Sequence, residues 1–182
     1  MSRYVAFLRG MNLGGRRITN ADLGAHFEAI GLADVATFRA SGNVIFSADE
    51  GTAEDLGARL EAELAKRLAY EVPVFLRSAA DVASIAAQRP FRAAELAASK
   101  GKLQVQLLGE EPTSAARREA LAEAGAEDRL ELIGRELYWL PSGGISESEL
   151  DLRAIERALG PGTTRTMGTI EQIAARHCPP PG

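Results

Sequence analysis

The stretch VATFRASGNVIFS, residues 35–47, places two β-prone runs on either side of a Ser-Gly-Asn turn. Apolar and β-branched side chains suit strands, and a short Gly- and Asn-containing segment between them is typical of a tight hairpin. Strands joined by a hairpin are antiparallel, whereas a parallel sheet needs a crossover between its strands. The stretch therefore favours an α+β fold over a parallel α/β fold.

The patterns around this hairpin complete a β-α-β-β-α-β order. A short apolar strand is predicted at residues 4–8, and a helix with one apolar face is predicted between Thr19 and Gly31. A second helix is predicted to start near Thr52, with leucines four residues apart from Leu56 to Leu68 on its buried face, and residues 72–76 supply the last strand. This order is that of the split βαβ, or ferredoxin-like, unit.

A similar pattern restarts in the second half of the chain, where a strand and a helix precede a hairpin around Gly134-Arg135. We therefore expect two ferredoxin-like subdomains related by duplication. The final residues, Cys-Pro-Pro-Pro-Gly, cannot continue a helix. The expected parts are an N-terminal ferredoxin-like subdomain at 1–78, a connecting helix and linker at 79–101, a C-terminal α+β subdomain at 102–176, and a disordered tail at 177–182.

The composition limits the classes of function. The chain has 182 residues, 46% of them hydrophobic and 25% charged, which is ordinary for a globular protein. Its single cysteine excludes an intrachain disulfide, and its apolar runs are too short to span a membrane. Arg9 interrupts the apolar N-terminal stretch before it reaches the length of a signal peptide. We expect a cytoplasmic protein with no membrane partner.

The charge is unevenly distributed. The net charge of the chain is -4, whereas a nucleic-acid-binding protein usually carries a basic surface, so a nucleic-acid partner is disfavoured. Residues 1–48 nevertheless contain five arginines and only three acidic residues. A locally positive segment on an acidic protein can concentrate a small anion, although a chance run of solvated arginines is an equally valid interpretation.

The stretch FLRGMNLGGRR, residues 7–17, has the glycine spacing of the phosphate-binding motif G-x-x-x-x-G-K-S/T between a strand and a helix. Arg17 cannot supply the hydroxyl that binds magnesium, so a nucleoside triphosphatase of that class is disfavoured. Backbone N–H groups of such a turn can still surround an anion, with arginines adding charge-assisted hydrogen bonds. Alternatively, the glycines only form a tight connection, and Arg9 pairs with a carboxylate. The predicted ligand-binding residues are Arg9, Asn12, Gly14, Gly15, Arg16 and, from the second half, Arg165.

A second candidate cluster consists of Ser41, Asn43 and Arg77. Ser41 would need a base within hydrogen-bonding reach to act as a nucleophile, and neither His26 nor His177 is placed to serve, so a turn-forming role is favoured. We expect the loop after the first strand and the hairpin to lie at opposite ends of the sheet, which would separate the two clusters. No cofactor is predicted, and no metal site, because the adjacent donors of His177 and Cys178 do not make a tetrahedral set.

Several motifs, taken in order, resemble those of the bacterial DUF1697 family, a family of unknown function. They are residues 7–15, Thr37, residues 41–46, Pro73-Val74, Arg77, Pro90-Phe91, Leu137-Tyr138 and residues 163–165. The resemblance implies two ferredoxin-like α+β subdomains and no defined activity.

The chain departs from a late family motif that resembles Thr-x-Arg-Asn-Trp-x-Thr. Here Thr166 and Met167 stand in place of the Asn and the Trp. If those two residues share a function in the family, this protein has altered or lost it. If they cap and pack the last helix, Thr166 can cap the helix and Met167 can fill the space.

The leading hypothesis is a cytoplasmic protein that binds a small anionic ligand, such as a phosphorylated metabolite, at the Gly-rich loop. Whether it transforms this ligand stays open, as does its oligomeric state. One alternative is a structural or protein-interaction module without catalytic activity. Single-stranded nucleic-acid binding is the third hypothesis, and it is disfavoured because residues 44–46 lack the aromatic spacing of a base-stacking sheet surface and the pI is about 5.3.

Overall fold

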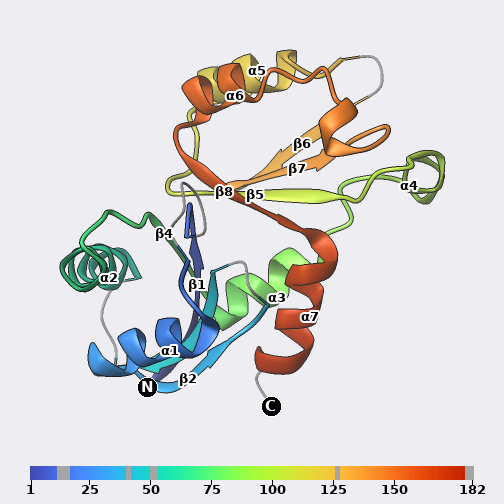
Figure 1. Ribbon diagram of the computed structural model, residues 1–182. Helices are drawn as coiled ribbons and strands as arrows, with labels where there is room; N and C mark the ends of the chain where they lie inside the picture. The colour runs from blue at the N-terminus through green and yellow to red at the C-terminus, as the bar shows by residue number, and fades with distance from the viewer. Residues whose placement is uncertain (12–16, 40–41, 50–52, 126–127, 179–182) are drawn as a thin grey trace. The chain divides into compact units, whose positions relative to one another are not determined.

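The computed structural model describes residues 1–11, 17–39, 42–49, 53–125 and 128–178 (Figure 1). It divides into two compact units, which are considered one at a time. The first unit consists of Met1–Ser84 together with Ile173–Gly182, and the second consists of Ile85–Gln172.

The first unit has the predicted β-α-β-β-α-β order, followed by a further helix. Its sheet has the strand order β2-β3-β1-β4, and each neighbouring pair is antiparallel. The predicted α+β, ferredoxin-like fold is thereby confirmed. The elements are β1 (Ser2–Leu8), α1 (Asn20–Ala29), β2 (Ala33–Thr37), β3 (Asn43–Ala48), α2 (Ala53–Leu68), β4 (Val74–Ser78) and α3 (Ala79–Ala87), whose last three residues belong to the second unit.

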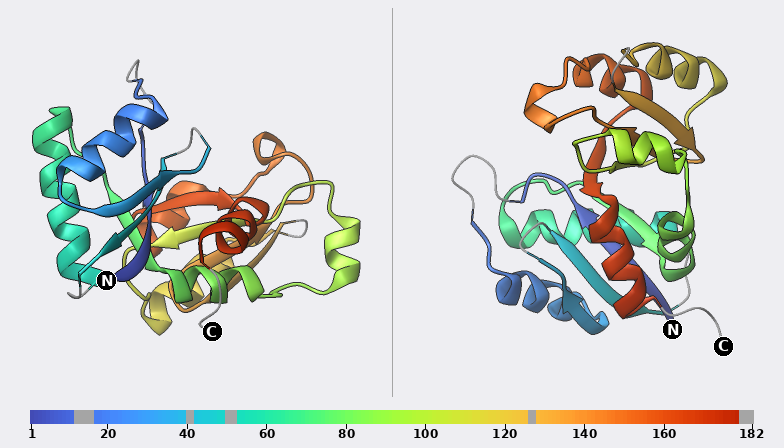
Figure 2. Two further views of the ribbon diagram at one scale, coloured as in Figure 1. Left: turned by 90° about the horizontal axis from the view of Figure 1, so that it is seen from below. Right: turned by 90° about the vertical axis from the view of Figure 1, so that its right-hand side faces the viewer.

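One face of this sheet packs against α1 and α2, which lie side by side in Figures 1 and 2. Alternate residues of β1 point to this face, so Tyr4 joins the core cluster that also contains Phe27 of α1 and Leu60 of α2. Phe46 of β3 lies between the aromatic rings, with centroids 5.6 Å from Phe27 and 6.0 Å from Tyr4. Burial of such side chains contributes about 1.5–3 kcal/mol each, which stabilises the packing of both helices on the sheet.

The register of β1 and β3 places the hairpin at the end of the sheet where β1 finishes. Phe7 pairs with Asn43, and the Leu8 amide donates a hydrogen bond to the Gly42 carbonyl at 2.8 Å. The expectation that the loop after the first strand and the hairpin lie at opposite ends is therefore wrong. Because β3 runs antiparallel to β1, it begins where β1 ends. Arg77 pairs with Val5, three residues before Leu8 along β1.

The second unit repeats this topology with the strand order β6-β7-β5-β8. Its Leu108 amide donates to the Arg135 carbonyl at 3.0 Å, which matches the contact of Leu8 with Gly42. Helices α5 and α6 cover one face of this sheet (Figure 1) and share a small core with Leu132 and Leu137. The elements are α4 (Ala93–Ala98), β5 (Gln104–Leu108), α5 (Ser114–Ala122), β6 (Arg129–Ile133), β7 (Glu136–Leu140), a 3-10 helix (Ile145–Glu147), α6 (Leu152–Leu159) and β8 (Gly162–Thr166).

The last helix, α7 (Met167–His177), begins in the second unit and ends in the first. The expected disordered tail at 177–182 is wrong for its first two residues, because His177 is helical and Cys178 is buried. The His177 ring packs edge-on against the Phe38 ring, with the ring centroids 6.3 Å apart. This contact holds the end of α7 in place just before the chain reaches its prolines. Residues 179–182 lie outside the described part of the chain. No helix within the described residues is both long and apolar enough to cross a bilayer.

Candidate functional site

The Gly-rich loop leaves the first sheet at Arg9. The Arg9 amide donates a hydrogen bond to the Pro73 carbonyl at 3.0 Å, which holds the chain against the start of β4, and Arg9 is half-buried. Four of the predicted ligand-binding residues, Asn12, Gly14, Gly15 and Arg16, lie outside the described residues, as does Ser41 of the second cluster. The site is therefore defined by the described residues on either side of the Gly-rich loop and of the hairpin turn.

Gly42 joins the two loops. It has φ +71°, and an added Cβ would lie 3.1 Å from Leu8 Cβ and 3.1 Å from Met11 Cγ. Met11 itself is buried in the core beneath α1 and α2. Only glycine satisfies both the left-handed backbone and this close approach. The base of the Gly-rich loop and the hairpin turn are thus packed directly against each other.

Phe38 lies at the other end of the hairpin turn, directly after β2. Its amide donates to the Asn43 carbonyl at 3.0 Å, and the Asn43 side-chain amide donates back to the Phe38 carbonyl at 2.9 Å. Asn43 is only 1% exposed. The structure therefore places this residue of the second candidate cluster inside the hairpin, where its side chain closes the turn.

Two guanidinium groups lie over the Phe38 ring. The Cζ atom of Arg39 is 5.6 Å from the ring centroid, and the Cζ atom of Arg176 in α7 is 5.5 Å from it. Each contact has the geometry of a cation–π interaction, worth about 0.5–1 kcal/mol at an exposed position. Arg39 has φ +56°, a left-handed conformation that costs a non-glycine residue about 1–2 kcal/mol. Sequence reasoning missed this cluster because Arg176 is remote from Phe38 along the chain.

The surroundings of His177 are also positive. Burial lowers the pKa of its imidazole, and the charges of Arg3 and Arg176 lower it further. Arg3 donates hydrogen bonds to the Asp34 carbonyl at 2.9 Å and to Ser47 Oγ at 3.2 Å, which holds its charge beside the sheet. The positive charges in this part of the first unit therefore favour the neutral form of the imidazole, and they would attract an anion.

Arg77 and Arg165 occupy equivalent positions in the two units. Arg77 pairs with Val5 across β4 and β1, and Arg165 pairs with Val105 across β8 and β5. Arg77 is 1% exposed and Arg165 is 9% exposed. In each unit the next residue is a hydroxyl residue at the start of a helix, and this repeated Arg-Ser/Thr pair is the sequence signal that could have identified them.

The Arg165 guanidinium makes hydrogen bonds within its own strand. Its Nη1 donates to Thr163 Oγ1 at 2.8 Å and to the Thr164 carbonyl at 2.9 Å. Burial lowers the pKa of Arg165 to about 10, because the charged form loses water. These contacts describe a guanidinium held inside the sheet, and the predicted ligand role of Arg165 stays a prediction.

The two residues that depart from the late family motif have structural roles. The Thr169 amide donates to Thr166 Oγ1 at 3.2 Å, so Thr166 caps the start of α7. Met167 is 6% exposed and fills buried space. The capping and packing requirements of this segment are therefore satisfied without the Asn and the Trp.

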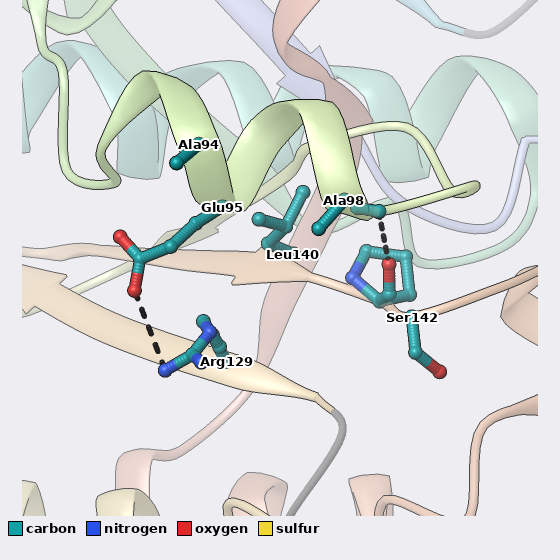
Figure 3. A pocket seen from close by; sticks show the side chains of 8 residues that line it. Ala94, Glu95, Ala98, Arg129, Leu140 and Ser142 are labelled. Atoms are coloured by element: carbon teal, nitrogen blue, oxygen red, sulfur yellow. Dashed lines mark hydrogen bonds and ion pairs between the residues drawn. The ribbon is translucent and has the colours of Figure 1, made fainter.

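A pocket of about 320 Å³ lies beneath α4 in the second unit (Figure 3). Glu95 of α4 reaches across it to Arg129 of β6 at 3.3 Å, and Leu140 lies between α4 and the sheet. At the other end, the Ser99 hydroxyl donates to the Pro141 carbonyl. Because the carboxylate and the guanidinium neutralise each other, this pocket has no evident preference for an anion.

A larger pocket of about 500 Å³ in the same unit is acidic. It is lined by Glu123, Asp128, Glu147 and Glu149 among others, and the Asp128 carboxylate accepts hydrogen bonds from the Ser142 amide and the Ser148 hydroxyl. In the part of the chain that the structure describes, no three His, Cys, Asp or Glu side chains form a group that could hold a metal ion. Neither pocket was indicated by the sequence, because each combines residues from separate elements.

Comparison with known proteins identifies a family and a fold. The family model described as "Protein of unknown function (DUF1697)" matches residues 1–138. The solved structure of the conserved bacterial protein SP0830 from Streptococcus pneumoniae is similar, with a TM-score of 0.74 and 20% sequence identity over 96% of this chain and 97% of that one. No curated protein matches the chain. At this identity the structural similarity establishes the fold alone.

Proposed function

Because the chain belongs to the DUF1697 family, whose function is unknown, we propose from its geometry that it binds a small anionic ligand such as a phosphorylated metabolite. The binding region is the end of the first sheet where the Gly-rich loop leaves β1. The proposal includes the cytoplasmic location expected from the sequence. It makes no claim of catalysis.

The proposal depends on one observation, the 2.8 Å hydrogen bond from the Leu8 amide to the Gly42 carbonyl. This contact brings the Gly-rich loop and the hairpin to the same end of the sheet. Since β3 alone separates β1 from β2, the backbones at Arg9 and Arg39 are about two strand spacings, or roughly 10 Å, apart. Long arginine side chains from both loops can therefore reach one small ligand.

The charges at this end support an anion. Arg9, Arg39 and Arg176 belong to it, and the exposed Arg17 follows the Gly-rich loop. The chain as a whole carries a net charge of -4, so these arginines form a local exception that would attract an anion. The sequence further predicts that residues 12–16 contribute backbone N–H groups to the ligand.

Thermal shift and calorimetric titration of the full chain test this proposal. The probes are phenyl phosphate, inorganic phosphate and benzoate, and the variants are Arg9→Ala and, as a control, Arg118→Ala on the exposed side of α5. A probe at about a hundredfold its Kd stabilises the folded chain by roughly 2.7 kcal/mol, which raises Tm by a few degrees. We expect this shift in the wild type and the control and a smaller one in Arg9→Ala.

The same experiment separates the alternatives. If no anion binds the wild type and the chain forms a concentration-dependent dimer, an interaction module replaces the proposal. If Arg9→Ala binds each probe as the wild type does, the Gly-rich loop is not the binding region.

A further inference from the structure

The surface around the 3-10 helix of the second unit combines an exposed apolar side chain with charges of both signs. Ile145, the first residue of this helix, is 50% exposed. Lys100 and Lys102 lie just before β5, Glu149 lies just after the 3-10 helix, and all three residues are exposed. No ion pair or hydrogen bond joins the side chains of these three residues to any other described residue. Their charges are therefore available to a partner molecule.

The two lysines lie beside the residues that lead into the 3-10 helix. The Lys100 amide donates a hydrogen bond to the Ser142 carbonyl at 2.9 Å. An added Cβ at Gly101 would overlap the Gly143 carbonyl oxygen, so the backbones of the two segments are in direct contact. These contacts fix the backbone from which both lysine side chains extend.

The 3-10 helix separates the positive charges from the negative one. It spans Ile145–Glu147 and rises about 2 Å per residue, so its two ends are only about 6 Å apart. The lysine segment contacts the residues before the helix, and Glu149 lies two residues after it. The Glu147 carboxylate accepts a hydrogen bond from the Gly144 amide at 3.0 Å, which holds the short helix in place. One compact surface thus has a positive side, an apolar centre and a negative side.

We infer that this surface is the contact of a symmetric dimer, in which a second copy of the chain is related to the first by a two-fold axis at Ile145. A two-fold axis places the same patch on both sides of the interface, so the patch must be complementary to itself. The two Ile145 side chains meet at the centre, and Lys100 of each copy faces Glu149 of the other. The contact is made by the second unit alone, so the inference goes beyond the anion site of the first unit and does not depend on it.

The unpaired charges favour a second copy as the partner. A patch of one sign would repel its own copy, whereas this patch carries both signs on opposite sides of an apolar residue. An apolar centre within a polar rim is the usual arrangement of a protein interface, and the charges of the rim fix the orientation of the partners. A contact made by two short segments is smaller than the standard interface of about 1,600 Å², so the dimer should form at micromolar rather than nanomolar concentrations.

Sedimentation velocity of the full chain, over a range of about 1–500 µM protein, tests the dimer. The charge variants are Lys100→Glu and Glu149→Lys, and Ile145→Ser removes the apolar centre. The matched controls are Arg118→Glu on α5 and Glu28→Lys on α1, which make the same changes of charge at exposed positions elsewhere. The melting temperature of each variant checks its folding.

We expect the wild type and both controls to dimerise with the same Kd. Each charge variant should weaken the dimer by about tenfold or more, because the two-fold axis turns one replacement into two repulsive pairs. Ile145→Ser should weaken the dimer by a similar factor, since it removes the apolar contact from both copies. An equimolar mixture of Lys100→Glu and Glu149→Lys should regain about the wild-type Kd, because every pair across the mixed dimer again joins opposite charges.

Three results would overturn the inference. If the wild type stays monomeric over the whole concentration range, the patch does not bind its own copy. If none of the three variants changes the Kd, the dimer uses another surface. If the single charge variants weaken the dimer but their mixture does not restore it, Lys100 and Glu149 do not face each other across a two-fold axis. None of these results bears on the anion site of the first unit, because that site is tested by ligand binding.

Discussion

Replacement of Gly42 by alanine tests the junction between the hairpin and the Gly-rich loop. Two costs arise at this position. The left-handed backbone at φ +71° costs an alanine about 1–2 kcal/mol. The new methyl group would lie 3.1 Å from Leu8 Cβ and 3.1 Å from Met11 Cγ, and overpacking of this kind costs about 1–3 kcal/mol. We therefore expect Gly42→Ala to lower the free energy of unfolding by about 2–5 kcal/mol.

Two other glycines of the first unit provide matched controls. Gly31 has φ +92° and nothing within 4 Å of an added Cβ, so Gly31→Ala should show the backbone cost alone, about 1–2 kcal/mol. Gly57 lies within α2 with open space around it, so Gly57→Ala should stabilise the protein by about 1 kcal/mol.

Urea unfolding followed by circular dichroism measures all three changes from the midpoint and slope of the transition. The reasoning would be refuted if Gly42→Ala cost no more than Gly31→Ala. That result would mean that Leu8 and Met11 do not crowd the hairpin turn, and the two loops would not form one site.

Three further predictions concern other parts of the chain. An NMR titration should show the pKa of His177 below its usual value, and Arg176→Ala should raise it; an unchanged midpoint in the variant would contradict this. The free energy of unfolding should fall as pH drops through about 6.5, because the unfolded state binds the proton before the folded state does. Thr113→Ala removes the hydroxyl that caps α5 at 3.2 Å and should lower stability by about 0.5–2 kcal/mol, whereas Thr113→Ser should retain most of it in the same urea assay. Gly101→Ala would press a methyl group into Pro141 and should destabilise the protein by about 1–3 kcal/mol, and a neutral melting temperature would disprove the close approach.

The local patterns of the sequence predicted the hairpin, α1, α2 and the ferredoxin-like order of the first unit, because each depends on neighbouring residues. In the second unit, α4 and the last strand, β8, were not predicted. The relative position of the two candidate clusters was predicted wrongly, because it depends on the direction in which β3 pairs with β1. An arginine in a strand is usually exposed, so the burial of Arg77 and Arg165 was not expected either.

The contribution of α7 to the first unit was also missed. Arg176 and Phe38 lie far apart in the sequence, and no periodic pattern connects them. The three prolines at the chain end suggested disorder from residue 177, but the contacts of His177 and the burial of Cys178 extend the ordered chain to residue 178. Contacts between remote segments carry no local signal, and this part of the site required the structure.

Amide chemical shifts of the isotopically labelled full chain, titrated with phenyl phosphate, test the central claim most directly. Binding at the proposed site should shift the amides of Leu8, Arg9, Arg39 and Arg176 and those of residues 12–16, with smaller changes elsewhere. The account would be contradicted if the chemical-shift changes were confined to residues 85–172. It would also be contradicted if no amide shifted at phenyl phosphate concentrations at which calorimetry shows binding to be saturated.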